Sequence, residues 1–396
     1  MSTISIMEIP PEFEIILKCF PFTGVLFPIS NTENQKTKVL NKLVSTLKYL
    51  VEVIFLLYTG YAIYLAIFFG IYASKTLRAT SVAIHAILLL LRVSMLSRKS
   101  FILKTLLKLR IFEAPNPENR KHIQSSLWKY ALFACALCIF IPISIAVCST
   151  SMILSNIEKY NKLLKFIYMN CTESSLNVPT ILVFSVNQMM YMIHFFMFPG
   201  LVMTLLSFVY LSYVKTFLRH LMAVRLALLH HFSREEIAKA LMLFTVARKI
   251  RSHLEKSVSF ITFVAYVLTF GNILHLVCAV ASNYMSEEES LRDAYSISIF
   301  SWTVVCFVVL TMCGSEVARI EGFTKNMAQE VISKNFRMKP EGNKKLIYLT
   351  LLNSCSGYKM RFTGWGLFEV DKKLFLTISG VLVTYGVLFA SELRKT

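Results

Sequence analysis

Long apolar stretches alternate along the chain with shorter stretches that are rich in lysine and arginine. Six apolar stretches lie at about residues 47–72, 77–96, 128–154, 180–211, 258–282 and 294–313, and a seventh lies at 374–390. A helix rises about 1.5 Å per residue, so about 20 residues cross a hydrocarbon core of about 30 Å. The pattern predicts an all-α membrane protein with seven transmembrane helices and with its two ends on opposite sides of the membrane.

Basic residues concentrate in every second connection between these stretches. The connections after the second, fourth and sixth stretches hold many lysines and arginines, whereas the others hold only Lys75, Lys159, Lys162, Lys165 and Arg292. By the positive-inside rule, the basic connections are cytoplasmic. We therefore expect an N-terminus inside and a C-terminus outside, with residues 1–45 as a cytoplasmic N-terminal tail that contains short helical pieces.

Helical periodicity continues beyond the expected membrane segments. Ser233 and Glu236 form a capping box, the signature of a helix start. Apolar residues recur at helical spacing on both sides of it, which predicts a cytoplasmic helical hairpin near 211–257 beside transmembrane helices 1–6 at 46–313. Residues 314–372 are expected to form a cytoplasmic helical loop. The apolar faces of these helices must pack on each other or on another subunit, and we expect the hairpin near Ser233 to contact a second subunit.

The seventh stretch is unusual because small and polar residues interrupt it. Asp371 can cap the start of a helix, and no residue between Leu374 and Ala390 is charged. The interrupting residues are Thr377, Ser379, Gly380, Thr384, Tyr385 and Gly386. Such residues let helices approach closely or face a wet cavity. This helix is therefore either packed in the bundle or lines a pore.

Composition and charge agree with a membrane protein and argue against several other classes. Of 396 residues, 55% are hydrophobic and 16% are charged, against roughly 25% charged in soluble proteins. The net charge is +19, and the basic residues lie between the apolar stretches. The expected partner is therefore the anionic lipid of the bilayer and not a nucleic acid. The sequence contains no phosphate loop, no G-x-S-x-G and no H-E-x-x-H. We expect no enzyme activity, no cofactor and no metal.

One expected external connection carries a modification signal. Asn170-Cys171-Thr172 is an N-glycosylation acceptor pattern, and it falls where the charge pattern places the chain outside. Asn170 is therefore a candidate glycosylation site. Cys148 and Cys171 both lie near the expected outer face and can pair, whereas the other cysteines are expected to be small apolar core residues.

Polar and aromatic residues gather in the outer halves of several expected helices. The ligand-binding candidates are Gln188, Tyr191, Asn272, His275 and Trp302. Aromatic walls with a few polar anchors are typical of a small-molecule pocket. An aromatic belt with hydrogen bonds between helices explains the same pattern, so both interpretations stay open.

Three ionisable residues lie within the second and fourth stretches, and their roles are considered separately. His85 and His194 lie inside expected membrane helices, where each histidine either contacts a ligand or is packed and hydrogen-bonded. Arg92 lies near an inner end, and we expect its long side chain to extend to the cytoplasmic interface.

The end of the chain resembles an arthropod gustatory receptor. That family closes with T-Y, five hydrophobic residues and Q-F, and here Thr384 and Tyr385 are followed by Gly386 and four hydrophobic residues, V-L-F-A. The preceding run at 364–371, G-W-G-L-F-E-V-D, is similar to the family's approach to its last helix. Ser391 stands where glutamine is usual, and Glu392 stands where phenylalanine is usual. The number of spans, the orientation and the large inner loops also match.

The resemblance implies a ligand-gated, non-selective cation channel in the plasma membrane. Members of the family assemble as homo- or heterotetramers around the last helix, here within 373–396, and bind a small-molecule tastant in the outer half of each subunit. The implied pore and gate residues are Thr384, Tyr385, Ser391 and Glu392.

Other membrane-protein classes remain as alternatives. Odorant receptors of the related family share the layout but end with a different tyrosine-rich pattern. A G-protein-coupled receptor needs the opposite orientation, and the expected D-R-Y and N-P-x-x-Y are absent from the sequence. A secondary transporter typically shows inverted repeats and paired broken helices, which the sequence does not show.

Epitope tags at the two ends test the predicted orientation. An N-terminal tag should be detected only after permeabilisation, and a C-terminal tag on intact cells. Removing the acceptor with Asn170→Gln should increase electrophoretic mobility. Labelling of the N-terminal tag on intact cells would contradict the orientation.

Overall fold

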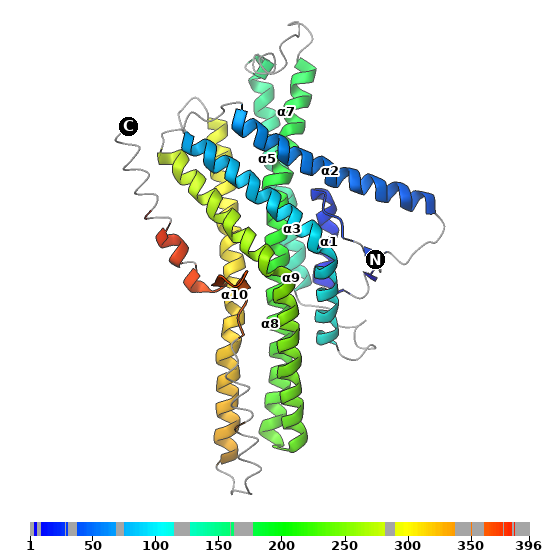
Figure 1. The fold of residues 1–396 in the computed structure, drawn as a ribbon, viewed down its shortest axis with the longest axis vertical. Helices are drawn as coiled ribbons and strands as arrows, with labels where there is room; N and C mark the ends of the chain where they lie inside the picture. Colours follow the sequence, from blue (N-terminus) through cyan, green and yellow to red (C-terminus); the bar gives the residue numbers. More distant parts are fainter. Residues whose placement is uncertain are drawn as a thin grey trace.

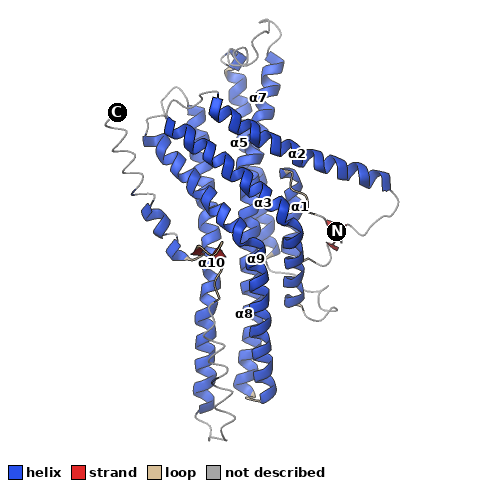
Figure 2. Ribbon diagram, in the orientation of Figure 1, coloured by secondary structure: helices blue, strands red, loops and turns tan. Residues whose placement is uncertain are grey.

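The computed structural model is an elongated bundle of helices with two pairs of very short strands (Figure 1, Figure 2). It describes residues 4–5, 9–27, 29–30, 38–68, 75–114, 127–158, 160–161, 177–281, 290–336, 350, 360–374, 376–381 and 384. The helices are α1 (Pro11–Cys19), η2 (Phe20–Thr23), α2 (Lys38–Phe68), α3 (Lys75–Glu113), α5 (Trp128–Ser155), α7 (Asn177–Met192), η4 (Ile193–Met197), α8 (Phe198–His230), α9 (Arg234–Ala281) and α10 (Ser290–Phe336). The strands are β1 (Ile4–Ser5) and β2 (Ile29–Ser30), which pair in parallel, and β3 (Thr363–Gly364) and β4 (Phe368–Glu369), which pair antiparallel.

Five helical segments are long and apolar enough to cross a membrane. They are Leu77–Glu113, Trp128–Ser155, Val178–His230, Arg234–Cys278 and Phe300–Lys334, and α2 adds a shorter apolar section at Tyr49–Tyr64. The predicted class, an all-α membrane protein, is confirmed. Helices α3, α8, α9 and α10 are longer than any membrane requires, and α8, α9 and α10 extend together beyond one end of the bundle (Figure 1).

Helix α8 is the most deeply buried of these segments. In the segment that contains α7, η4 and α8, 89% of the most apolar window is buried, against 28–50% in the other four. α8 contacts α1, α3, α5, α9 and α10. Helix α8 is also hydrogen-bonded to α9, since the hydroxyl groups of Tyr210 on α8 and Thr262 on α9 share a buried hydrogen bond of 2.8 Å. The core of the bundle therefore forms around α8.

The N-terminal segment contributes to this core. Phe13, Ile16 and Leu17 of α1 are buried, and α1 packs against α5 and α8. Ser212 of α8 donates a hydrogen bond of 2.9 Å to the buried carboxylate of Glu12. A short helix was expected in this segment, but its docked position was not.

Arg92 lies at the contact between this segment and the bundle. Its side chain is fully buried, and its guanidinium donates a hydrogen bond of 2.6 Å to the carbonyl of Thr23. The same group lies 4.8 Å from the ring centroid of Phe55 and 4.3 Å from that of Phe198. The expectation that Arg92 extends to the cytoplasmic interface is wrong, because η2 covers this side of α3. Its charge is stabilised by a carbonyl and two aromatic faces.

The expected helical hairpin is formed by the C-terminal part of α8 and the N-terminal part of α9. The hydroxyl of Ser233 accepts a hydrogen bond of 3.3 Å from the amide of Glu236, as a helix cap requires. Phe217 and Phe244 meet across the hairpin with ring centroids 6.1 Å apart. Of the two alternatives for its apolar faces, packing on each other is the one observed. Leu226 is 56% exposed on the outer face of the hairpin.

The last helix begins from a small hairpin that is held on α9. The amide of Trp365, between β3 and β4, donates to the carbonyl of Ser259 at 3.2 Å, and its ring packs on Phe260 and Phe263. Asp371 then caps the helix, because its carboxylate accepts hydrogen bonds from the amides of residues 373 and 374. The described start of this helix diverges from α10 (Figure 1), and Leu376 is 71% exposed, while Leu374 and Ile378 still pack against the core.

Charge substitutions on the two faces of the hairpin should have different effects. Phe244→Asp places a carboxylate in the packed face, so we expect a loss of at least about 3 kcal/mol of stability and little folded protein. Leu226→Asp, on the exposed face, should change the stability of the subunit by about 0.5 kcal/mol or less. Thermal unfolding of the purified proteins measures both. Equal destabilisation would contradict the observed packing.

Candidate ligand site between the membrane helices

The five ligand-binding candidates lie on three elements of the bundle. Gln188 and Tyr191 belong to α7, Asn272 and His275 to α9, and Trp302 to α10. All five side chains are half-buried. The structure divides them into residues that tie helices together and residues that surround a group of aromatic rings.

Asn272 and His275 make hydrogen bonds to neighbouring helices. The Nδ1 atom of His275 lies 2.8 Å from the hydroxyl of Thr80 on α3. The side-chain amide of Asn272 donates to the hydroxyl of Thr303 on α10 at 3.5 Å. These contacts hold α9 between α3 and α10, as polar side chains inside a membrane commonly do. For this pair, hydrogen bonding between helices is the role that the geometry supports.

Trp302 covers the start of α8. A Cβ atom at Gly200 would lie 2.8 Å from Cζ2 and 3.1 Å from Nε1 of the indole, so only glycine leaves room for the ring. The Nε1 atom is buried and has no hydrogen-bond partner among the described residues. A buried donor without an acceptor costs about 1–3 kcal/mol. A ligand or water that presents an oxygen atom at this position would remove that cost.

Tyr191 belongs to a group of rings that also contains two histidines. Its ring centroid lies 4.5 Å from that of Phe195, which in turn lies 4.9 Å from His85 and 5.1 Å from His194. Tyr58 of α2 approaches His194 at 5.7 Å. Elements α2, α3, α7 and η4 therefore meet at one aromatic and imidazole cluster. The sequence identified His85 and His194 as candidates separately, but it gave no indication that Phe195 joins them.

A π turn positions this cluster. In η4, the amide of Phe198 bonds to the carbonyl of Ile193, five residues earlier. Pro199 follows directly, and proline has no amide hydrogen and clashes with the carbonyl of the fourth residue before it. The helix widens at this position, and π turns of this kind are frequent at functional sites. The widened turn contributes the buried residues His194, Phe195 and Phe196.

His194 retains one unused polar atom. Its Nε2 atom lies 3.5 Å from the hydroxyl of Thr59, whereas its Nδ1 atom is buried and has no hydrogen-bond partner in the described part of the chain. Aromatic faces, an imidazole and an indole N–H suit an uncharged or weakly polar organic molecule. No group of three or more histidine, cysteine, aspartate or glutamate residues within the described ranges could hold a metal ion.

Of the remaining candidates for the pore, for glycosylation and for a cysteine pair, only Thr384 and Cys148 lie within the described residues. Thr384 is exposed, and its hydroxyl donates to the carbonyl of Gly380 at 2.9 Å. The other pore candidates, together with the glycosylation candidate and one of the two outer cysteines, lie outside the described residues: Tyr385, Ser391, Glu392, Asn170 and Cys171. Cys148 is exposed.

Replacing Gly200 should test the contact with Trp302. Gly200→Ala forces the indole to move and should destabilise the protein by about 1–3 kcal/mol. Gly271→Ala is the control, because its Cβ would lie 3.5 Å from Ile84, an ordinary contact. Adding Trp302→Phe to Gly200→Ala should restore part of the lost thermal stability. Equal melting temperatures for the two alanine variants would contradict the contact.

Comparison with known proteins places this arrangement among solved receptors. No protein-family model and no curated protein matches the sequence. The structure of the insect olfactory receptor OR5 from Machilis hrabei in complex with eugenol matches with a TM-score of 0.64, at 12% identity, over 95% of this chain and 96% of that chain. A second structure of the same receptor matches with a TM-score of 0.63, at the same identity and coverage. The chain therefore has the fold of an insect olfactory receptor.

Proposed function

We propose that the chain is a subunit of a chemosensory receptor of the plasma membrane that acts as a ligand-gated, non-selective cation channel. The observation that carries the proposal is the likeness to an insect olfactory receptor, which extends over 95% of this chain and 96% of the other. A likeness of this extent argues against an enzyme, a G-protein-coupled receptor or a secondary transporter, because it covers the whole receptor architecture.

Within chemosensory receptors, we propose a gustatory receptor. Thr384 and Tyr385, followed by Gly386 and four hydrophobic residues, favour that family. The related odorant receptors remain the second candidate, and the fold likeness fits them equally well, since the matched structure is an olfactory receptor. The ligand class separates the two: a tastant for the first, a volatile odorant for the second.

The ligand in this proposal is a small organic molecule that binds beside η4. The matched receptor was solved in complex with eugenol. In this chain, the rings of Tyr191 and Phe195 offer apolar walls, and Nε1 of Trp302 offers a donor without a partner among the described residues. We propose a ligand with an aromatic or apolar body and at least one hydrogen-bond acceptor.

The pore in this proposal is lined by the last helix of each of four subunits, in a homo- or heterotetramer. Its described part carries few contacts with its own subunit, because Leu374 and Ile378 reach the core while Leu376, Thr377, Gly380 and Thr384 are exposed. A helix with small and hydroxyl residues on its exposed face suits a wet pore better than lipid. The outer face of the hairpin near Ser233 would contact a neighbouring subunit.

Expression in a non-neuronal cell line tests the proposal. Currents are recorded while sugars, bitter compounds, amino acids and volatile aromatic compounds are applied, alone and with a related receptor as co-subunit. A ligand-evoked current that reverses near 0 mV in mixed cations is expected. Ligand responses that require G-protein signalling, or saturable uptake without conductance, would contradict a channel.

Glu392→Gln tests the outer end of the pore. Four copies of Glu392 would form a ring of carboxylates, which concentrates cations and repels anions. The substitution should therefore lower the single-channel conductance and the permeability to calcium relative to sodium. Glu392→Asp, which keeps the negative charge at the same position, is the matched control. Unchanged conductance and calcium permeability in a channel that still opens would exclude Glu392 from the pore.

A further inference from the structure

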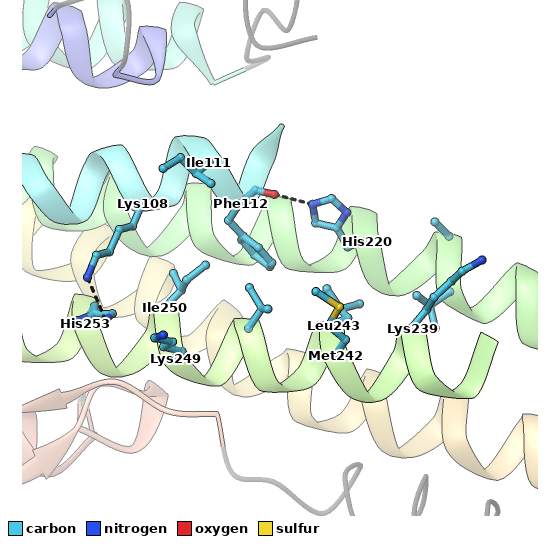
Figure 3. Close-up of a pocket in the computed structure, with 13 residues that line it drawn as sticks. Lys108, Ile111, Phe112, His220, Lys239, Met242, Leu243, Lys249, Ile250 and His253 are labelled. Carbon is cyan, nitrogen blue, oxygen red and sulfur yellow. Dashed lines mark hydrogen bonds between the residues drawn. The ribbon is translucent and has the colours of Figure 1, made fainter. Parts of the chain in front are cut away.

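A groove of about 760 Å³ lies far from the aromatic cluster, between the end of α3 and the hairpin of α8 and α9 (Figure 3). We name it the inner groove. Its lining residues are Lys108, Ile111, Phe112, His220, Ala223, Val224, Lys239, Met242, Leu243, Val246, Lys249, Ile250 and His253. Its volume falls in the usual range of small-molecule sites, about 300–1,000 Å³. From the sequence, these residues were expected only in the basic connection after the second apolar stretch and in the hairpin near 211–257.

The charges of the inner groove have one sign. Three lysines and two histidines line it, and none of the described lining residues is acidic. The nearest acidic residue along α3, Glu113, is buried and is paired with Arg110 at 3.1 Å and Arg219 at 3.8 Å. Lys239, at the far end, is paired with Glu236. An anion is therefore favoured at the other end, where Lys108 and Lys249 lie.

At that end, a lysine and a histidine are in contact. The ammonium group of Lys108 donates a hydrogen bond of 3.0 Å to Nε2 of His253, as Figure 3 shows. Partial desolvation, and then the charges of Lys108, Lys249 and Lys256, lower the pKa of His253. A cation donating to a neutral imidazole beside further cations is an arrangement that a bound anion would relieve.

Beyond this end, the groove is mostly apolar, with His220 and Lys239 as its polar lining residues, and it runs away from the membrane. The apolar part of α9 that enters the membrane begins near residue 258, so His253 and Lys249 are closest to it, followed by Val246 and Met242. From residue 253 to residue 239, the groove follows α9 for about 21 Å at 1.5 Å per residue. On α3, Phe112 likewise lies beyond Lys108. The cationic end is thus at the membrane side and the apolar wall lies below it.

We propose that the inner groove binds a fatty-acid anion, with its carboxylate against Lys108, Lys249 and His253. Its alkyl chain lies along Phe112 and Val246. A bilayer phospholipid is disfavoured, because its acyl chains must stay in the membrane while the apolar wall extends away from it. A single-chain carboxylate can leave the bilayer and use both the charge and the wall. The bound molecule would connect the end of α3 to the hairpin.

Binding of a fluorescent long-chain carboxylate to the full-length protein in nanodiscs of zwitterionic lipid tests this site. Saturable binding that hexadecanoate displaces, and that its methyl ester does not, is expected. The double variant Lys108→Gln, Lys249→Gln should weaken binding at least about tenfold, because each lost charge-assisted hydrogen bond contributes to affinity. Val246→Trp should reduce binding by filling the groove.

The matched control is Lys104→Gln, Arg248→Gln, which removes the same charge from exposed positions outside the inner groove. It should bind the probe as the unmodified protein does, and all variants should keep similar melting temperatures. Equal binding by the two double variants, equal competition by the methyl ester, or displacement only by vesicles with inositol phospholipids would overturn the proposal. This readout requires no channel activity, so it is independent of the proposed receptor function.

Discussion

The burial of α8 is the constraint on which the rest of the structure depends. α8 is apolar over most of its length, and five helices cover it. Burying an apolar helix inside a lipid bilayer gains little from the hydrophobic effect, so close packing and hydrogen bonds must hold the bundle together. Gly200 lets the ring of Trp302 reach the helix backbone, and Tyr210 bonds to Thr262. Each helix that packs on α8 does so through contacts of this kind.

The same constraint connects the inner side of the bundle to the candidate ligand site. Arg92 joins η2 to the rings of Phe55 and Phe198, and Phe198 closes the π turn that carries His194. The N-terminal segment, α2, α3 and the start of α8 therefore share one buried cation. A ligand beside η4 would act on a turn that is packed against this cation, which gives a short physical route from the ligand site to the inner helices.

The sequence predicted those features that depend on residues close together in the chain. Apolar stretches located the spanning helices, Ser233 marked the start of α9 and Asp371 capped the last helix. Features that need distant residues were not predictable in this way. The docking of α1 depends on contacts with α5 and α8, and the burial of Arg92 depends on the carbonyl of Thr23, 69 residues away. The inner groove combines residues of three helices, and the π turn was indicated only by Pro199.

We propose that the last helix, whose described part exposes Leu376, Thr377, Gly380 and Thr384, lines a cation pore. Thr384→Cys places a thiol on its exposed face, at the position where the family pattern begins. A positively charged methanethiosulfonate reagent, applied from outside during ligand-evoked currents, measures whether this face is in the conduction path. We expect a lasting loss of current in the variant and no loss in the unmodified protein. Undiminished current after demonstrated modification of the thiol would contradict it.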